Sequence, residues 1–295
     1  MSPSVADIFE KHRPQLLGLA YRMLGTMSDT DDVLQEAFLR WSRVDPQTVE
    51  TPGAYLRSVV TRLCIDHRRS VQSRREQYIG PWLPEPVGDS SSSFGEDRGE
   101  MAESLSMAFL VLLETLSPTE RAAYLLRKVF DYEYGEISGI LDKSEANCRQ
   151  MVHRAEQHLR NRRPRFDISS KETERLASEF LRACSTGDID GLVQLLADDA
   201  VLVSDGGGKA IAARRPISGA DNIARFLIGV VKKSPAGFKI EPVIVNGELG
   251  YAAFVEGTLT TVYAFEASGG KVTKMFIVRN PDKLQRFTSI AALPQ

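Results

Sequence analysis

A segment that disfavours both helix and strand divides this chain of 295 residues. Residues 76–104 contain Pro81, Pro84 and Pro86, several glycines and a run of four serines at 90–93. Prolines and glycines interrupt regular secondary structure, and serine-rich stretches bury too little apolar surface to fold. We therefore predict a linker at 76–104. Because a domain typically has about 100–200 residues, the chain is long enough for two or three domains around it.

Charge is distributed in blocks, although the net charge of the whole chain is only −2. Residues 76–116 carry eight acidic residues and one basic residue, whereas residues 1–75 and 117–165 are each mildly basic. The sequence pI near 6.2 argues against a protein that coats nucleic acid through bulk attraction. It leaves room for binding through local basic faces on the blocks beside the linker.

The chain shows no pattern of a membrane or secreted protein. It lacks an apolar run of the ~18 residues that span a membrane, and charged residues from Asp7 to Arg13 interrupt any signal-peptide core. We expect a cytoplasmic protein without membrane association. Cys64, Cys148 and Cys184 lack the paired spacing of zinc or redox sites. We expect three reduced thiols, no metal and no cofactor.

The first block, residues 1–75, is patterned as three helices. The first ends at Gly25, and the second begins behind an acidic cluster at 29–32 and runs to Trp41. After a polar loop at 45–52, a third helix has an apolar stripe of Leu56, Val59, Val60, Leu63 and Cys64. A basic helix end alone is usually only a partner of the helix dipole. Away from the stripe we nevertheless predict a phosphate-binding face of Arg57, Thr61, Arg62, Arg68 and Arg69.

The second block, residues 105–165, is patterned as a helix-turn-helix. Ser117 and Glu120 give the signature of a capping box, a short helix follows at about 133–141, and Ser144 caps a longer helix that reaches about Arg160. The apolar face of the longer helix holds Cys148, Val152, Ala155 and Leu159. Its polar face holds Asn147, Arg149, Gln150, His153 and Arg154. Guanidinium and amide groups can read base edges in a major groove. An ordinary three-helix bundle with a solvated face also fits this block.

Residues 166–295 change from helical to strand patterns. Helical spacing covers about 176–196 and 222–231, a short strand is predicted at 200–204, and four longer strands lie between 238 and 279. Helices followed by antiparallel strands indicate an α+β domain. This block has no histidine and no paired carboxylates at a spacing diagnostic of acid–base catalysis, so we do not expect an enzyme. Asp199, Asp205 and Tyr251 are the groups available for acid–base chemistry in an apolar pocket.

The two helical blocks resemble the conserved domains of extracytoplasmic-function sigma factors, a class of bacterial transcription initiation factor, over residues 8–70 and 105–160. The resemblance implies an all-α region 2 at 1–75 and an all-α region 4 at 105–165, which bind core RNA polymerase and promoter DNA. It also implies that the loop 45–52 recognises a flipped −10 base.

The same resemblance implies three sets of contact residues. The polymerase-binding set is Asp31, Asp32, Leu34, Gln35, Glu36, Phe38 and Trp41. The −10 DNA-binding set is Arg57, Thr61, Arg62, Asp66, Arg68 and Arg69. The −35 DNA-binding set is Ser144, Asn147, Arg149, Gln150, His153 and Arg154. Asn147 and Cys148 depart from the Thr-Val that is commoner in the family, so the preferred −35 sequence is not implied.

Residues 166–295 resemble the SnoaL-like, NTF2-like cone, and three phrases resemble the signature of sigma factors with such a C-terminal fusion, the SigJ-like subgroup. The resemblance implies regulation through these phrases in place of a separate anti-sigma protein, and a possible small-molecule ligand in the C-terminal domain. Truncation after Phe287 is then expected to alter promoter output. The phrases are Trp82-Leu83-Pro84-Glu85-Pro86, Asp205-Gly206-Gly207-Gly208-Lys209 and Asn280-Pro281-Asp282-Lys283-Leu284.

Two other functions remain open from the sequence. One is a helix-turn-helix regulator fused to a ligand-binding or enzymatic SnoaL-like domain. The other is a binding module without a role in transcription. Binding to core RNA polymerase distinguishes a sigma factor from both.

Overall fold

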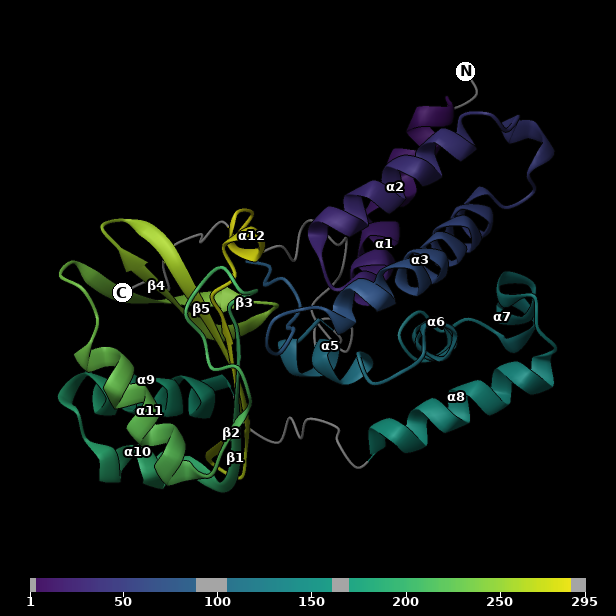
Figure 1. The fold of residues 1–295 in the computed structure, drawn as a ribbon. Coiled ribbons are helices and arrows are strands. Elements are labelled where there is room, and N and C mark those ends of the chain that lie inside the picture. Colours follow the sequence, from purple (N-terminus) through teal and green to yellow (C-terminus); the bar gives the residue numbers. More distant parts are fainter. Residues whose placement is uncertain (1–3, 89–104, 161–169, 288–295) are drawn as a thin grey trace. The chain divides into compact units, whose positions relative to one another are not determined.

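The structure, a computed structural model, describes residues 4–88, 105–160 and 170–287 and divides the chain into two compact units (Figure 1). The first unit comprises residues 1–76, 90–105 and 110–163, and the second comprises 77–89, 106–109 and 164–295. Residues 77–88 have no helix or strand, as predicted, but they belong to the second unit rather than to a separate spacer. The serine run at 90–93 and the residues after Phe287 lie outside the described residues.

The described part of the first unit is helical. Its first group of helices is α1 (Val5–Leu24), α2 (Met27–Trp41) and α3 (Pro52–Glu76), with a 3-10 turn (Pro46–Thr48) in the predicted loop. Its second group is α6 (Pro118–Lys128), α7 (Tyr134–Leu141) and α8 (Glu145–Arg160). A short helix, α5 (Met107–Leu113), precedes α6, and its first turn is counted with the second unit.

Local sequence signals set several helix ends. Gly25 adopts φ +78°, and this left-handed conformation lets its amide donate to the Tyr21 carbonyl (2.8 Å) at the end of α1. At the start of α6, Ser117 and Glu120 form the reciprocal capping box that their spacing predicts. The Ser144 hydroxyl accepts a hydrogen bond from the backbone amide of Asn147, the third residue of α8 (3.3 Å). The predicted helix-turn-helix is therefore confirmed in its bounds.

Helix α3 buries more of its surface than its apolar stripe predicts. Leu56, Val60 and Cys64 are fully buried, as expected. However, Thr61 and Arg68 are buried too, so the prediction that they lie on an exposed basic face is wrong for the arrangement in this structure. The reason is that α3 packs against α6 and α7 as well as against α1 and α2. A helix between two groups of partners buries two faces, and the periodicity of α3 shows only the apolar one.

The second unit is an α+β domain with one sheet (Figure 1). Its helices are α9 (Ser170–Thr186), α10 (Ile189–Leu195), α11 (Ala220–Lys232) and α12 (Pro281–Leu284). Its strands are β1 (Leu196–Asp205), β2 (Ile217–Ser218), β3 (Phe238–Val245), β4 (Glu248–Val255), β5 (Thr258–Ser268) and β6 (Lys271–Val278). The sheet order is β2-β1-β6-β5-β4-β3. Residues of α9, α10 and α11 share one apolar core with β1, β5 and β6.

The sheet departs from its predicted form at β1. This strand begins at Leu196, which the helical spacing had placed in the preceding helix, and it pairs with β6 in parallel. The short strand β2 was not predicted. The four longer strands, β3 to β6, pair antiparallel as predicted, whereas the parallel pairing of β1 with β6 was not predicted. Parallel pairing joins residues about 70 positions apart, and neither strand carries a local signal of its partner.

Candidate nucleic-acid interface and linker site

The exposed face of α8 carries the residues predicted to read the −35 element. Cys148, Val152 and Leu159 are buried on the opposite face. The polar face follows a short helix, α7, and the turn 142–144, which is the geometry of a helix-turn-helix. The exposed side chains of this face are Ser144, Asn147, Arg149, Gln150, His153 and Arg154.

Arg149 has the most defined position on this face. Its Nη2 donates to Glu145 Oε2 (2.7 Å), and its guanidinium carbon lies 5.0 Å from the centre of the Tyr134 ring. Both groups of the ion pair are about half exposed, so solvent weakens the attraction between them. Such a guanidinium can exchange its carboxylate for a phosphate or a base edge at little cost.

Basic residues of α3 contact the helix-turn-helix within the first unit. Arg62 donates from Nε to the Ile140 carbonyl (2.9 Å) and from Nη2 to the Gly139 carbonyl (2.8 Å). These carbonyls lie in the last turn of α7, where the helix dipole favours a positive charge. The Arg57 guanidinium lies 5.1 Å from the centre of the Tyr132 ring, and burial lowers the pKa of Arg57. Arg57 and Arg62, which were predicted to hold −10 phosphates, thus contact region 4 in this structure.

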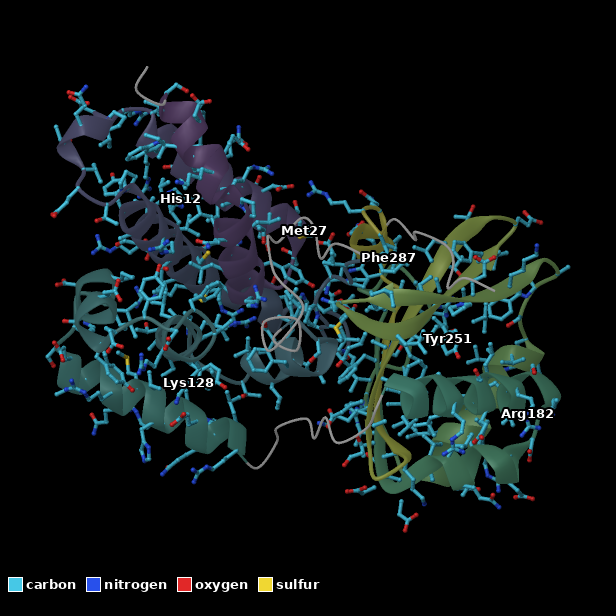
Figure 2. All side chains as sticks on the ribbon, turned by 180° about the vertical axis from the view of Figure 1, so that it is seen from behind. His12, Met27, Lys128, Arg182, Tyr251 and Phe287 are labelled. Atoms are coloured by element: carbon cyan, nitrogen blue, oxygen red, sulfur yellow. The ribbon has the colours of Figure 1, made fainter. Side chains whose placement is uncertain are left out.

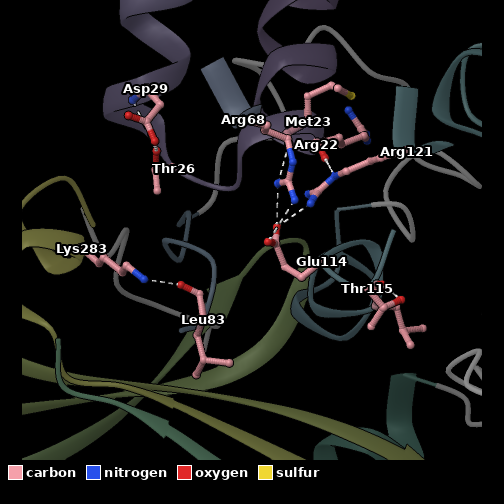
Figure 3. A network of polar contacts seen from close by, with 11 residues as sticks. Arg22, Met23, Thr26, Asp29, Arg68, Leu83, Glu114, Thr115, Arg121 and Lys283 are labelled. Carbon is pink, nitrogen blue, oxygen red and sulfur yellow. Dashed lines mark hydrogen bonds and ion pairs between the residues drawn. The ribbon is translucent and has the colours of Figure 1, made fainter. Parts of the chain in front are cut away.

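A buried charge cluster, which we call the Glu114 cluster, joins α3 and α6 (Figure 3). It consists of Arg68, Glu114 and Arg121. The guanidiniums of both arginines donate to the Glu114 carboxylate, and Arg68 also donates to the Met23 carbonyl (3.0 Å). Arg121 is fully buried and donates from Nε to the Arg22 carbonyl (2.8 Å). Because both arginines are buried, removal of the carboxylate takes away the anion that the two guanidiniums share.

The remaining residues of the predicted −10 set differ in exposure. The buried Thr61 hydroxyl donates to the Arg57 carbonyl within α3 (2.8 Å), which is a structural role. Asp66 and Arg69 are exposed, with 3.7 Å between the carboxylate and the guanidinium. We therefore keep Arg57, Arg62, Asp66 and Arg69 as candidate DNA contacts and remove Thr61 and Arg68.

One face of α2 is a candidate surface for a protein partner. Asp32, Gln35 and Glu36 are exposed at helical spacing, and Leu39, which the sequence analysis missed, continues the same face with 45% of its surface exposed. Only the burial of each side chain in the structure shows that this leucine is exposed among polar residues.

Two residues predicted for this surface lie in the helical core instead. Leu34 is buried, and Trp41 is fully buried and donates from its indole nitrogen to the Val5 carbonyl (2.9 Å). We correct both to structural roles. Asp31 and Phe38 are half-buried at the edge of the surface.

The three phrases of the second unit meet at one buried carboxylate, that of Asp205. We call the cluster of Tyr78, Leu83, Asp205, Asn280 and Lys283 the linker site. Asp205 is fully buried and accepts hydrogen bonds from the Tyr78 hydroxyl (2.6 Å), the Leu83 amide (2.9 Å) and Lys283 Nζ (2.7 Å). Lys283 also donates to the Leu83 carbonyl, as Figure 3 shows, and lies 4.1 Å from the centre of the Trp82 ring. One ion pair therefore binds the backbone and an aromatic ring of the linker.

Further contacts extend the linker site along residues 78–87. Asn280 donates from Nδ2 to the Tyr78 hydroxyl (2.8 Å), and burial, with the Asp205 carboxylate, raises the pKa of Tyr78. Asn246 and Val87 exchange two hydrogen bonds, from Val87 N to Asn246 Oδ1 (3.2 Å) and from Asn246 N to Val87 O (2.7 Å). Tyr78 and Asn246 were not predicted from the sequence, and neither stands in one of the three phrases.

The glycines that follow Asp205 allow the chain segments to approach closely. A Cβ atom on Gly207 would collide with the Asn280 side chain, and one on Gly208 would lie 2.9 Å from Ile79 of the linker. Gly207 and Gly208 also adopt positive φ values of 59° and 73°. The absence of side chains at these glycines therefore leaves room for Asn280 and Ile79, within a turn that the Lys209 amide closes on the Gly206 carbonyl (2.9 Å).

The described residues show no clustered metal ligands, and their cysteines are buried. They contain no group of three or more potential metal-ligating side chains. Cys64, Cys148 and Cys184 are free and buried, and burial raises the pKa of Cys184 to about 12. A protonated, buried thiol is a poor nucleophile. Within the described residues, no helix is both long enough and apolar enough to cross a membrane.

Comparison with known proteins identifies the family. The Sigma-70 region 2 model matches residues 8–75, the Sigma-70 region 4 model matches 106–159, and the SnoaL-like domain model matches 177–282. The chain is 34% identical to the ECF RNA polymerase sigma factor SigJ of Mycobacterium tuberculosis, over 93% of this chain and 91% of that protein. The chain belongs to the extracytoplasmic-function sigma factors.

A second relative and a solved structure also match nearly the whole chain of this sigma factor. It is 30% identical to the probable ECF RNA polymerase sigma factor SigI of Mycobacterium tuberculosis, over 95% of this chain and 94% of that protein. The crystal structure of Mycobacterium tuberculosis SigJ matches with a TM-score of 0.77 and 31% identity, and the match covers 95% of this chain and 98% of that one. The predicted order of two helical domains followed by an α+β SnoaL-like domain is confirmed.

The acid–base groups considered for an enzyme do not form an active site in this sigma factor. Asp199 is exposed, and Asp205 is committed to the linker site. Tyr251 is buried, and burial raises its pKa to about 12, so it stays protonated at neutral pH. The family consists of transcription initiation factors, so the prediction that the chain is not an enzyme is confirmed.

Proposed function

We propose that the linker site controls how far the two promoter-binding domains of this sigma factor can separate, and thereby controls initiation. As a sigma factor, the chain binds core RNA polymerase and promoter DNA and directs promoter-specific transcription. The observation that carries the proposal is the buried pair of Lys283 and Asp205, which binds the linker at Trp82 and Leu83. Linker residues bound in this way are not available to span the distance between region 2 and region 4.

The length of the bound segment gives the size of the effect. An extended residue spans at most about 3.3–3.6 Å, so release of residues 77–88 adds up to about 40 Å of reach. The −10 and −35 elements lie on one duplex, and both domains must reach their elements together. A C-terminal domain that withholds this reach acts in place of a separate anti-sigma protein.

The exposed helix faces support the assignment of the promoter and polymerase contacts. We assign polymerase binding to the α2 face of Asp32, Gln35, Glu36 and Leu39, and −35 recognition to the polar face of α8. The loop 45–52 captures a −10 base, and Arg57 and Arg62 hold phosphates after Tyr132 and α7, respectively, release them. The protein acts in the cytoplasm with the polymerase, and its C-terminal domain holds a small-molecule ligand.

Run-off transcription with purified core RNA polymerase tests the proposal. On a genomic promoter library at a stated salt concentration, specific start sites are expected only when the protein is added. The variant Lys283→Met is expected to give more transcript from the same start sites, because it releases the linker. Arg225→Gln, which removes an exposed ion pair with Asp221 on α11, is the matched control and is expected to match the wild type. Equal yields from the Lys283 variant and the wild type contradict the proposal.

The α8 surface gives a test of promoter selectivity. Replacement of Gln150 with alanine is expected to remove about 1–3 kcal/mol of discrimination at one −35 position, because an amide reads a base edge through paired hydrogen bonds. Binding to −35 duplexes substituted at each position measures this loss. His158→Ala, an exposed change in the last turn of α8, is the control. A uniform loss at all positions would assign Gln150 to the phosphate backbone instead.

The loop 45–52 gives an independent test of −10 recognition. Replacement of this loop with a glycine–serine segment of equal length is expected to change the preferred −10 sequence and to leave the −35 preference unchanged. Sequencing of start sites from the same library measures both preferences. An unchanged −10 preference removes the loop from the recognition surface.

A further inference from the structure

The second unit contains a cavity between its sheet and α11 that the linker site does not use. Its volume is about 350 Å³, which lies in the range of small-molecule pockets. Leu227 and Val230 of α11 line it on one side, and Phe238 and Tyr263 of the sheet line it on the other. We call this space the cone cavity.

One end of the cone cavity is entirely apolar. Leu227, Val230, Phe238 and Tyr263 also line a smaller adjoining hollow of about 40 Å³. The rings of Phe180, Tyr251 and Phe265 close this hollow, with Phe265 centred 5.6 Å from Phe180 and 5.9 Å from Tyr251 in edge-on contacts. Tyr251 is labelled in Figure 2. Such a wall favours a hydrocarbon chain or an aromatic ring, because the transfer of apolar surface out of water lowers the free energy.

The other end of the cone cavity carries an unmatched cation. Arg279 lines the cavity and donates from Nη1 to the Ile211 carbonyl, while its buried Nε has no hydrogen-bond partner among the described residues. No described carboxylate lines the cavity, and Lys233 at its exposed edge adds a second positive charge. The pKa of Tyr263, which also lines the cavity, is raised by burial, and the charge of Arg279 opposes that rise. A guanidinium that lines a cavity and is bonded to a neutral carbonyl is suited to a carboxylate.

The cone cavity shares residues with the surroundings of the linker. Ser204, Ile211 and Ala212 line the cone cavity and also a second hollow of about 370 Å³, whose other wall includes Ile79 and Gly80 of the linker. The backbone amide of Arg279 donates to the Asp205 carbonyl (2.7 Å). The residue that would bind an anion is therefore bonded to the residue whose carboxylate binds the linker.

We propose that the cone cavity binds an amphipathic carboxylate, with its apolar body between α11 and the sheet and its carboxylate on Arg279, and that occupancy alters the hold of residues 204–213 on the linker. The ligand is a monocarboxylate with an alkyl or aromatic body. The consequence for initiation rests on the proposed function of the linker site, but the binding does not.

Calorimetric titration of the full-length protein tests the binding. The probes are decanoate and 2-naphthoate, with decanol as the uncharged match for decanoate. At least one carboxylate is expected to bind the wild type, and Arg279→Gln is expected to weaken that binding at least tenfold while decanol binding stays unchanged. Arg225→Gln, an exposed arginine of α11 paired with Asp221, is the matched control. Val230→Trp, which fills the cavity and keeps Arg279, is expected to abolish binding of both kinds of probe.

Three results of the titration overturn the proposal. They are no carboxylate binding to the wild type at millimolar concentration, equal carboxylate affinity of Arg279→Gln and wild type, and full carboxylate binding to Val230→Trp. Circular dichroism of each variant establishes whether the second unit is folded. If the Arg279 variant is not folded, the Val230 variant still tests the proposal.

Hydrogen exchange of the full-length protein tests the coupling to the linker. Saturation with the bound carboxylate is expected to change the exchange of amides in 77–88 and 204–213 in the wild type and not in Arg279→Gln. Unchanged exchange in 77–88 overturns the coupling. The titration and exchange experiments use neither polymerase nor DNA. A negative result in them therefore does not contradict the proposed function, and a negative transcription result does not contradict ligand binding.

Discussion

Replacement of Lys283 with methionine is expected to lower the free energy of unfolding of the second unit by about 3–5 kcal/mol. The change keeps most of the side-chain volume but leaves the fully buried Asp205 carboxylate without its cation. The chain has two tryptophans, of which Trp41 lies in the first unit and Trp82 in the second. Denaturant unfolding followed by Trp82 fluorescence, with Trp41→Phe in the reference and in the variants, measures the second unit alone.

Two comparisons test whether the loss of stability comes from the buried charge. Lys209→Gln breaks an ion pair with Asp282 in which both side chains are more than half exposed, and it is expected to cost less than about 1 kcal/mol. The double variant Lys283→Met with Asp205→Asn removes both charges and is expected to recover part of the stability. If the double variant is less stable than Lys283→Met by the full cost of Asp205→Asn alone, the two groups are not coupled and the account of the linker site is wrong.

Replacement of Glu114 with glutamine is expected to lower the free energy of unfolding of the first unit by about 3 kcal/mol. The variant keeps the shape of the side chain but leaves two guanidiniums, those of Arg68 and the fully buried Arg121, without a carboxylate. Trp41 fluorescence in a Trp82→Phe background follows the first unit. Because Cys64 is fully buried on α3, its reaction with a thiol reagent is expected to become faster as α3 loses its contact with α6.

Glu36→Gln is the matched control for the Glu114 cluster. Glu36 pairs with Arg40 on the exposed surface of α2 (2.8 Å), and its replacement is expected to cost less than about 1 kcal/mol and to leave the thiol reaction unchanged. Similar stability of the Glu114 and Glu36 variants would show that the Glu114 cluster does not hold region 2 to region 4.

The helices and their polar faces were predictable because their causes are local. A capping box such as Ser117 with Glu120 acts over three residues, and a helix face repeats every three or four residues. The polar face of α8 could therefore be assigned residue by residue. The three phrases of the linker site could be named from resemblance, but their meeting at one carboxylate could not, because its partners are 78 and 127 positions from Asp205 in the chain.

The errors have the same physical origin. Arg68 has the charge of an exposed, phosphate-binding residue, yet its partner Glu114 lies 46 positions away and makes its burial favourable. Trp41 and Leu34 stand on a helix assigned to a protein partner, and the helical core of their own unit covers them instead. A side chain whose type suggests a function, such as DNA binding, is misassigned when a residue distant in the sequence pairs with it or covers it.

The sequence by itself determined the helical blocks, the α+β domain that follows them, the exposed polar face of α8 and the family. These depend on periodicity, capping and motifs, which are properties of neighbouring residues. Only the tertiary structure decided the parallel pairing of β1 with β6, the hold of the second unit on residues 77–88 and the unmatched Arg279 in the cone cavity. Each of these depends on which distant groups bury one another, because the free energy of a charge or a strand edge is set by its partner in space and not by its neighbours in sequence.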